Sequence, residues 1–127
     1  MKANELRIRN WVNVTDKDYQ VTQILERGVN CGHIGAIYDL VKPIPLTEDW
    51  LTRFGFEKNE NGEPQIDACE GTALSISIGE TPYKYSAWLC VKGNFQYWQM
   101  STCEFVHELQ NFYFALTGEE LELKETK

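Results

Sequence analysis

The sequence predicts an α+β fold, in which one long C-terminal helix lies across a mostly antiparallel sheet of about six or seven strands. Three observations lead to this prediction. Residues 101–118 carry apolar side chains at three- and four-residue steps, the pattern of a helix with one buried face. Residues 72–78 alternate between apolar and small polar side chains, as a half-buried strand does. Gly93-Asn94 separates two further strand-like runs and suits a tight hairpin turn.

The long helix has a predicted start and a predicted end. Ser101 and Glu104 have the spacing of a capping box, in which each side chain accepts a free backbone N–H. The apolar stripe consists of Phe105, Leu109, Phe112 and Leu116. Gly118 stands where a left-handed residue would end the helix. We expect residues 118–127 to form a partly frayed tail.

The N-terminal part predicts strands and one short helix. Alternating side chains predict a half-buried strand over residues 5–14. A second strand is predicted over residues 19–26 and a third over residues 34–40, on either side of a glycine-rich loop that spans residues 28–35.

The short helix is predicted from its flanking signals. Thr47 is placed as the N-cap, and Leu46 and Leu51 have the spacing of a hydrophobic staple. Gly55 then ends the helix after about two turns.

Length and composition predict one soluble globular domain over residues 1–127. Hydrophobic residues make up 43% of the chain, enough for a single core. The net charge of −7 argues against a nucleic-acid partner, because phosphate binding needs a basic stripe. No apolar run suits a signal peptide or a membrane span, so we expect a cytoplasmic protein with reduced cysteines.

The hairpin around Gly93-Asn94 predicts a candidate binding surface. If Lys92 pairs with Phe95, one face bears the apolar side chains that would meet the long helix. The opposite face would carry Trp88, Phe95 and Tyr97 among polar residues, which is the composition of an interaction surface. The alternative is that another subunit of the same protein covers this face in a homo-oligomer.

Arg7, Arg9 and Trp11 form a second candidate site. In a strand over residues 5–14 they would share one outward face, where two guanidinium groups and an indole could bind a phosphate and stack a base. The alternative is an edge strand whose outward side chains are simply solvated.

Cysteine and histidine offer a third possibility. Cys31 and His33 form one thiol–imidazole pair and Cys103 and His107 form another, which together could ligate zinc. Cys103 near a helix start could also act as a nucleophile, because the helix dipole favours a thiolate. No phosphate-binding loop, dinucleotide motif or serine-hydrolase elbow is present, so we expect neither an enzyme nor a cofactor.

The chain also contains three distinctive stretches: NELRIRNWV near its start, KPIPLTEDWLTRFGFEK in its middle and VHELQNFYFALTGEEL near its end. Together they resemble a family of small uncharacterised proteins encoded by phages and mobile elements of Bacteroidetes-type gut bacteria. The family usually has glycine where this chain has Arg9, which implies that a tight backbone feature is absent here.

What the resemblance implies is a context rather than a chemistry. Small phage accessory proteins commonly bind host factors, including defence systems, so we expect a non-enzymatic protein that binds a host protein or a small molecule. Two alternatives stay open: a small Cys/His metal protein or enzyme, and a structural or assembly component of a virion.

Overall fold

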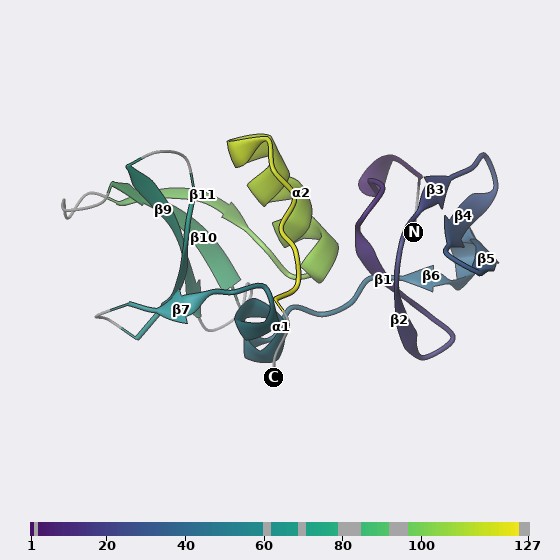
Figure 1. The fold of residues 1–127 in the computed structure, drawn as a ribbon, viewed down its shortest axis with the longest axis horizontal. Helices are drawn as coiled ribbons and strands as arrows, with labels where there is room; N and C mark the ends of the chain where they lie inside the picture. The colour runs from purple at the N-terminus through teal and green to yellow at the C-terminus, as the bar shows by residue number, and fades with distance from the viewer. Residues whose placement is uncertain (2, 60–61, 69–70, 79–84, 92–96, 125–127) are drawn as a thin grey trace. The chain divides into compact units, whose positions relative to one another are not determined.

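The computed structural model describes residues 1, 3–59, 62–68, 71–78, 85–91 and 97–124 (Figure 1). These residues form three antiparallel sheets of three, five and three strands, together with two α-helices and two short 3₁₀ helices. The α+β class, the mostly antiparallel pairing, and the short and long helices are confirmed. The strands are distributed over three sheets.

The packing divides the chain into two compact units. Unit 1 comprises Met1–Pro45 and Phe105–Asn111, and unit 2 comprises Leu46–Glu104 and Phe112–Lys127. That residues 1–127 make a single domain stays a prediction.

Unit 1 is built from two small sheets. The first has the order β2-β1-β6 and the second the order β3-β4-β5. The strands of the first sheet are β1 (Trp11–Val14), β2 (Lys17–Gln20) and β6 (Val41–Lys42). Those of the second are β3 (Gln23–Ile24), β4 (Gly28–Cys31) and β5 (Ile34–Ile37). The 3₁₀ helices are η1 (Ala3–Glu5) at the start and η2 (Tyr38–Leu40) before β6.

One extended segment joins the two sheets. Val21 N donates to Asn10 O at 2.8 Å beside β1, whereas Thr22 N donates to Asn30 O at 2.8 Å beside β4. The chain therefore changes sheet between β2 and β3, so this segment takes part in both small sheets of unit 1. The enclosed core consists of Leu6, Val12, Val14, Val21, Val29, Cys31 and Val41.

The predicted strand over residues 5–14 is wrong in its first half. The buried Asn10 closes a turn, because its Oδ1 accepts from Arg7 N at 2.7 Å and its N donates to Arg7 O at 3.1 Å. Arg9 lies inside this turn with a φ of 81°, in the left-handed region that glycine favours. The tight backbone feature that we expected to be absent is therefore present, with arginine in the glycine-favoured conformation.

The glycine-rich stretch over residues 28–35 is also not a loop throughout. It contains β4, a turn and the start of β5. Gly28 makes this pairing possible, because a Cβ at this position would lie 2.0 Å from the Ala36 carbonyl oxygen. Glycine here permits close strand approach.

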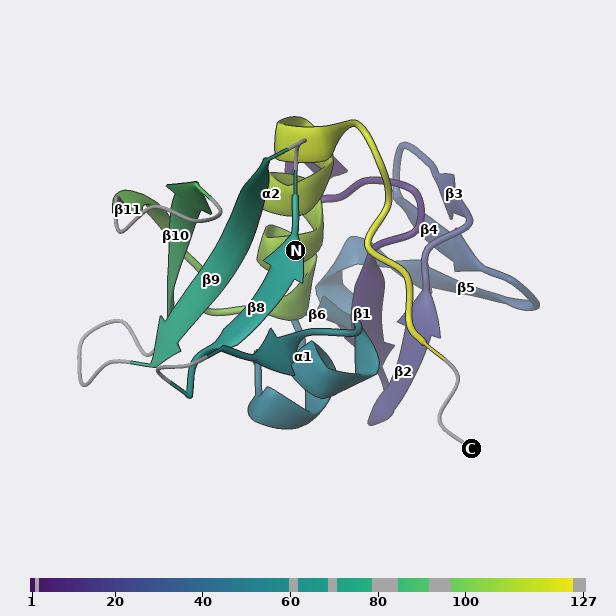
Figure 2. The same ribbon diagram turned by 60° about the vertical axis from the view of Figure 1, so that its left-hand side comes forward.

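Unit 2 contains the five-stranded sheet, in the order β11-β10-β9-β8-β7 (Figure 2). Its strands are β7 (Glu57–Lys58), β8 (Pro64–Asp67), β9 (Thr72–Ile78), β10 (Tyr85–Val91) and β11 (Tyr97–Thr102). The strand predicted over residues 72–78 is confirmed. Its central residues are buried on both faces, however, since Ala73 and Ser75 are as inaccessible as Leu74 and Ile76.

The hairpin register is confirmed for the part of the hairpin that the structure describes. Cys90 pairs with Tyr97 and Trp88 with Gln99, as pairing of Lys92 with Phe95 would require. The turn itself, with Lys92 and Phe95, lies outside the described residues. An irregularity between Ala87 and Trp88 shifts the pairs farther from the turn by one residue, so Ala87 pairs with Ser101 and Ser86 with Thr102.

Helix α1 (Glu48–Arg53) starts and ends where the sequence predicts. Thr47 Oγ1 accepts from Trp50 N at 3.4 Å, and Gly55 has a φ of 95°. Phe56 N donates to Leu51 O at 3.0 Å, which completes a Schellman-type end with two buried apolar side chains.

Helix α2 (Val106–Thr117) begins later than predicted. The expected capping box of Ser101 with Glu104 is wrong, because Ser101 belongs to β11 and pairs with Ala87. Glu108 Oε1 instead accepts from Phe105 N at 3.1 Å. Gly118, with a φ of 76°, ends the helix as predicted.

The C-terminal half of α2 and the residues after it pack in unit 2. Tyr113 is buried, and its hydroxyl donates to Asp67 O on β8 at 3.4 Å. Leu121 is buried and Lys124 N donates to Arg53 O at 2.6 Å. Leu121 and the backbone of Lys124 are thus held in this unit, whereas Glu119, Glu122 and the Lys124 side chain are exposed. Residues 125–127 lie outside the described part, and a partly frayed tail over residues 118–127 stays a prediction.

Candidate functional site

The predicted aromatic surface maps to one row across the sheet of unit 2. Trp88 on β10 is half-buried and pairs with Ser75 on β9. Ser75 pairs with Gln65 on β8, which pairs with Glu57 on β7. Directly paired residues share a face of a sheet, so these four side chains lie on one face. Of the other predicted residues, Tyr97 has a described backbone only and Phe95 lies outside the described residues.

The indole of Trp88 carries an unusual donor. Its Nε1 is buried and has no hydrogen-bond partner among the residues that the structure describes. The neighbouring polar groups bond to one another: Ser75 Oγ donates to Gln65 Oε1 at 3.3 Å and accepts from Asn59 Nδ2 at 3.2 Å. A buried donor without an acceptor costs about 1–3 kcal/mol.

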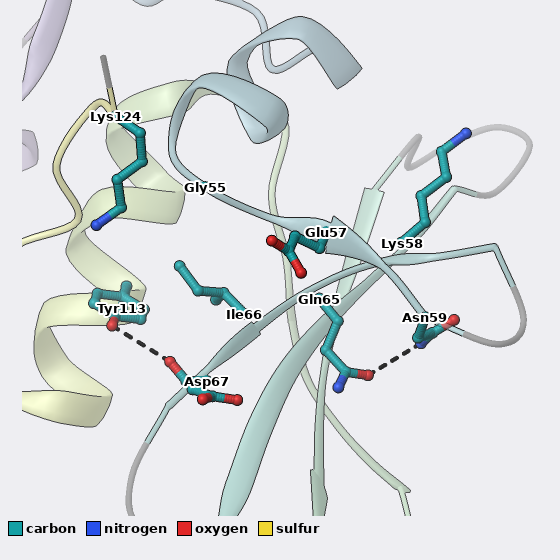
Figure 3. A pocket seen from close by; sticks show the side chains of 9 residues that line it. All are labelled: Gly55, Glu57, Lys58, Asn59, Gln65, Ile66, Asp67, Tyr113 and Lys124. Atoms are coloured by element: carbon teal, nitrogen blue, oxygen red, sulfur yellow. Dashed lines mark hydrogen bonds between the residues drawn. The ribbon is translucent and has the colours of Figure 1, made fainter. Parts of the chain in front are cut away.

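A groove of about 500 Å³ opens at the edge of the same sheet (Figure 3). It is lined by Gly55, Glu57, Lys58, Asn59, Gln65, Ile66, Asp67, Tyr113 and Lys124. The end of α1 explains the opening. Because Phe56 N bonds back to Leu51 O, the chain reaches β8 only from Glu57 onward. Ile66 and Asp67 thus lie beyond the end of the short strand β7.

Arg7 and Trp11 take structural roles in unit 1. Arg7 Nε donates to Asn111 Oδ1 at 2.9 Å, and Arg7 Nη2 donates to Gln110 O at 3.3 Å. Trp11 N donates to Gln110 Oε1 at 2.8 Å. Because of the turn at Arg9, the residues Arg7, Arg9 and Trp11 do not lie along one strand as predicted. Each of the three side chains is at least partly exposed.

This network is the part of the structure that the sequence interpretation missed. Asn10 and Gln110 are fully buried polar residues, and Asn10 Nδ2 donates to Asn111 Oδ1 at 2.8 Å. The sequence did contain one indication of this network: two adjacent amide side chains, Gln110 and Asn111, in a helix that is otherwise rich in apolar residues. Buried amides are paired in folded proteins, so this signal points to a specific partner.

The structure does not support the thiol–imidazole site. Among the described residues, no three of the His, Cys, Asp and Glu side chains gather where they could hold a metal ion. Cys31 lies in the core of unit 1, where burial raises the pKa of its thiol. His33 lies on the exposed turn that follows it.

Cys103 and His107 do not form the predicted helix-start pair. Cys103 is buried and precedes α2, so the helix start that was expected to favour its thiolate lies further along the chain. His107 is buried beside Phe105, with ring centroids 6.0 Å apart. Burial lowers the pKa of His107, against smaller opposite effects of Glu108 and Glu5.

Within the described ranges, no helix combines the length and the apolar character needed to cross a membrane. No protein-family model, no curated protein and no solved structure matches the chain significantly.

Proposed function

We propose that this chain is a non-enzymatic accessory protein of a phage or mobile element, which binds a host protein through the sheet face that carries Trp88. The observation that supports this most is the buried indole Nε1 of Trp88, which has no acceptor among the described residues. Tryptophan is enriched at the centres of protein interfaces because its ring buries a large area and its N–H can bind an acceptor.

The polar neighbours of Trp88 suit a protein partner. Ser75, Gln65 and Asn59 form a bonded cluster next to the indole. An aromatic side chain beside preorganised amides resembles the core and rim of an interface. An enzymatic function has less support, because the described thiols, Cys31 and Cys103, are buried and His107 is held neutral.

The test compares variants of two half-buried tryptophans. Tagged wild-type protein is expressed in a Bacteroidetes-type host and cross-linked, and its partner is identified by mass spectrometry and then purified for affinity measurement. Trp88→Ala should weaken binding by about 30-fold or more, the size expected for an interface hot spot. Trp11→Ala in unit 1 is the matched control and should change the affinity by less than about 2-fold.

Two results would contradict the proposal. One is unchanged affinity for Trp88→Ala in a protein whose circular dichroism matches wild type. The other is an equal loss with Trp11→Ala. Trp88→Phe, which keeps most of the ring and removes the N–H, serves if the alanine variant does not fold. Native mass spectrometry of the same samples shows whether this face instead joins copies of the chain: the subunit count would then change with the Trp88 variants.

A further inference from the structure

We infer that the outer edge of β5 in unit 1 is a docking site for an extended peptide strand of a partner protein. The strand would extend the sheet β3-β4-β5 through backbone hydrogen bonds and place one apolar side chain and one carboxylate in the groove beside β5. The site belongs to a different unit from Trp88 and does not rest on the proposed function. Two separate features of the described residues point to it: an unpaired strand edge and an apolar groove next to that edge.

The strand β5 is the last strand of its sheet. It pairs with β4 on one side, and in the described part of the chain no strand pairs with its other side (Figure 1). Along such an edge, alternate N–H and C=O groups point away from the sheet and can bond to another strand. The sequence of β5 is Ile-Gly-Ala-Ile, without the proline or charged residues that usually block edge pairing. The edge therefore suits an extended backbone.

The two faces of β5 differ. Ile34 and Ala36 pack against the core of unit 1, whereas Gly35 and Ile37 are exposed. Successive residues of a strand point to opposite faces, so Gly35 and Ile37 share the face that is turned away from the core. The side chains of an added strand would reach this face beside them.

This face holds a groove of about 250 Å³, which we call the β5 groove. Two of the side chains that line it are large, apolar and exposed: Leu25 is 42% exposed and Ile37 is 55% exposed. Gly28 lies between them, since it accepts from Leu25 N at 2.8 Å and pairs with Ile37. The volume is below the usual range of small-molecule sites, about 300–1,000 Å³, and suits a single side chain better than a whole ligand.

The fold keeps the β5 groove open. A Cβ at Gly28 would lie 2.0 Å from the Ala36 carbonyl oxygen, so no other residue fits there. At Gly35 the nearest atom that a Cβ would meet is Asn30 Oδ1, at 3.0 Å. The Asn30 side chain is itself held, because its Nδ2 donates to Gln23 Oε1 at 2.8 Å. The groove is therefore present before a partner binds, which lowers the entropic cost of binding.

The position of Leu25 is also fixed by the fold. Its carbonyl oxygen accepts from the hydroxyl of Tyr38, whose ring packs against the core of unit 1. Its N–H donates to Gly28 O across the turn between β3 and β4. An apolar side chain that enters beside Leu25 would thus meet a preorganised surface.

The β5 groove carries one positive charge. Arg27 is exposed in the turn between β3 and β4, and it is the single charged residue among the described residues that line the groove. The neighbouring Glu26 does not line it. The chain as a whole has a net charge of −7, so a positive groove differs from the overall surface. A guanidinium can bind a carboxylate through two parallel hydrogen bonds, so the partner strand should carry an acidic residue beside its apolar one.

Ile8 provides a matched control for Ile37. It belongs to the same unit, is 52% exposed and does not line the β5 groove. Ile37→Ser and Ile8→Ser remove the same side chain at similar exposure. A general effect of lost surface hydrophobicity would therefore appear in both variants.

The experiment titrates the full-length protein with blocked hexapeptides, Thr-Ser-Thr-X-Asp-Thr, and measures binding by calorimetry and amide NMR. Peptides in which X is Leu or Phe should bind at least about 10-fold more tightly than the peptide in which X is Ala. Ile37→Ser should weaken their binding about 10-fold, and Ile8→Ser less than about 2-fold.

Two changes to the peptide test the backbone pairing and the charge. Methylation of alternate backbone nitrogens, made in both phases, should weaken binding about 10-fold or more in one phase and much less in the other, because alternate N–H groups face β5. Replacing Asp by Asn should weaken binding about 5-fold, and Arg27→Gln should reduce this difference to less than about 2-fold.

Four outcomes would overturn the inference. The first is that neither the Leu nor the Phe peptide gives saturable binding at millimolar concentration. The second is that the two methylation phases have equal effects, since pairing along a strand edge requires a difference. The third is an equal loss with Ile8→Ser and Ile37→Ser. The fourth is a dimer of the peptide-free protein that dissociates on Ile37→Ser in sedimentation experiments, because a second copy of the chain would then cover this edge.

Discussion

The side chain of Gln110 binds the backbone on both sides of the turn at Arg9. Its Nε2 donates to Arg9 O at 2.9 Å, and its Oε1 accepts from Trp11 N at 2.8 Å. Gln110 is fully buried, so water does not compete for either bond. One residue of α2 therefore fixes the entry of the chain into β1.

Replacing Gln110 should destabilise the fold strongly. Gln110→Leu removes both bonds at a buried site, which we expect to lower the free energy of unfolding by about 2–4 kcal/mol. Gln20 provides the control, since its Nε2 donates to the same Arg9 carbonyl at 3.0 Å in a hydrogen bond that is exposed to solvent. Gln20→Ala should cost less than about 1 kcal/mol. Urea denaturation followed by circular dichroism measures both; equal losses would show that burial does not set the value of these bonds.

The φ of Arg9 predicts a stabilising substitution. A non-glycine residue in the left-handed region costs about 1 kcal/mol relative to glycine. Arg9 has a φ of 81°, so Arg9→Gly should relieve this cost. Arg9→Ala removes the same side chain but keeps the Cβ, so the difference between the two variants isolates the backbone effect. Arg9→Gly should be more stable than Arg9→Ala by about 1 kcal/mol in thermal denaturation. The reverse order would contradict the strained turn.

Short-range signals predicted the local structure well. Thr47, Gly55 and Gly118 act within one helical turn, and all three end or begin helices as expected. The hairpin register also follows from residues close in sequence. The errors arose where distant segments compete for the same residues. Ser101 and Glu104 fit a capping box, but pairing within β11 extends past Ser101.

For the candidate sites too, local features could be predicted from the sequence and contacts between distant segments could not. Trp88 could be placed on the face opposite Leu74 because strand parity is local. The groove could not be predicted, since it depends on where Lys124 meets Gly55, more than sixty residues away. The network around Asn10 was likewise hidden, because a parity argument gives no reason for a buried amide to face α2.

The orphan donor of Trp88 predicts a substitution that harms binding more than stability. Trp88→Phe deletes an N–H that has no acceptor among the described residues. Removing its desolvation cost of about 1–3 kcal/mol should offset the stability that is lost with the smaller ring. We expect its thermal midpoint to stay within a few degrees of wild type. The control is Trp50→Phe, because Trp50 is buried and packs against Phe54 and Arg53. A Trp88→Phe protein that unfolds earlier than Trp50→Phe would mean that the indole N–H is satisfied.

The N-cap of α1 predicts a smaller and position-specific effect. Thr47 Oγ1 accepts from Trp50 N, so Thr47→Ala should cost about 1 kcal/mol. Thr52 lies exposed within the same helix and offers the identical substitution without a capping bond. Thr52→Ala should be neutral or slightly stabilising, since alanine is the better helix former. Chemical denaturation of the two variants measures their free energies of unfolding. If Thr47→Ala and Thr52→Ala lost similar stability, Thr47 would not act as the N-cap.

The buried His107 makes the fold sensitive to acid. Burial lowers its pKa below the usual value of 6.5, so the unfolded chain binds this proton more readily than the folded one. Above pH 6.5 both states hold a neutral imidazole and the stability is unaffected. As the pH falls below 6.5, the unfolded state gains a proton that the folded state resists, and the free energy of unfolding decreases until the folded pKa is passed. Glu108 and Glu5 oppose the shift but do not cancel it.

His107→Phe keeps a ring beside Phe105 and removes the titrating group. Between pH 7 and pH 5, wild type should therefore lose stability relative to this variant. Urea denaturation at several pH values provides the measurement, and a difference that stays constant with pH would show that His107 is protonated as easily in the folded protein as in the unfolded chain.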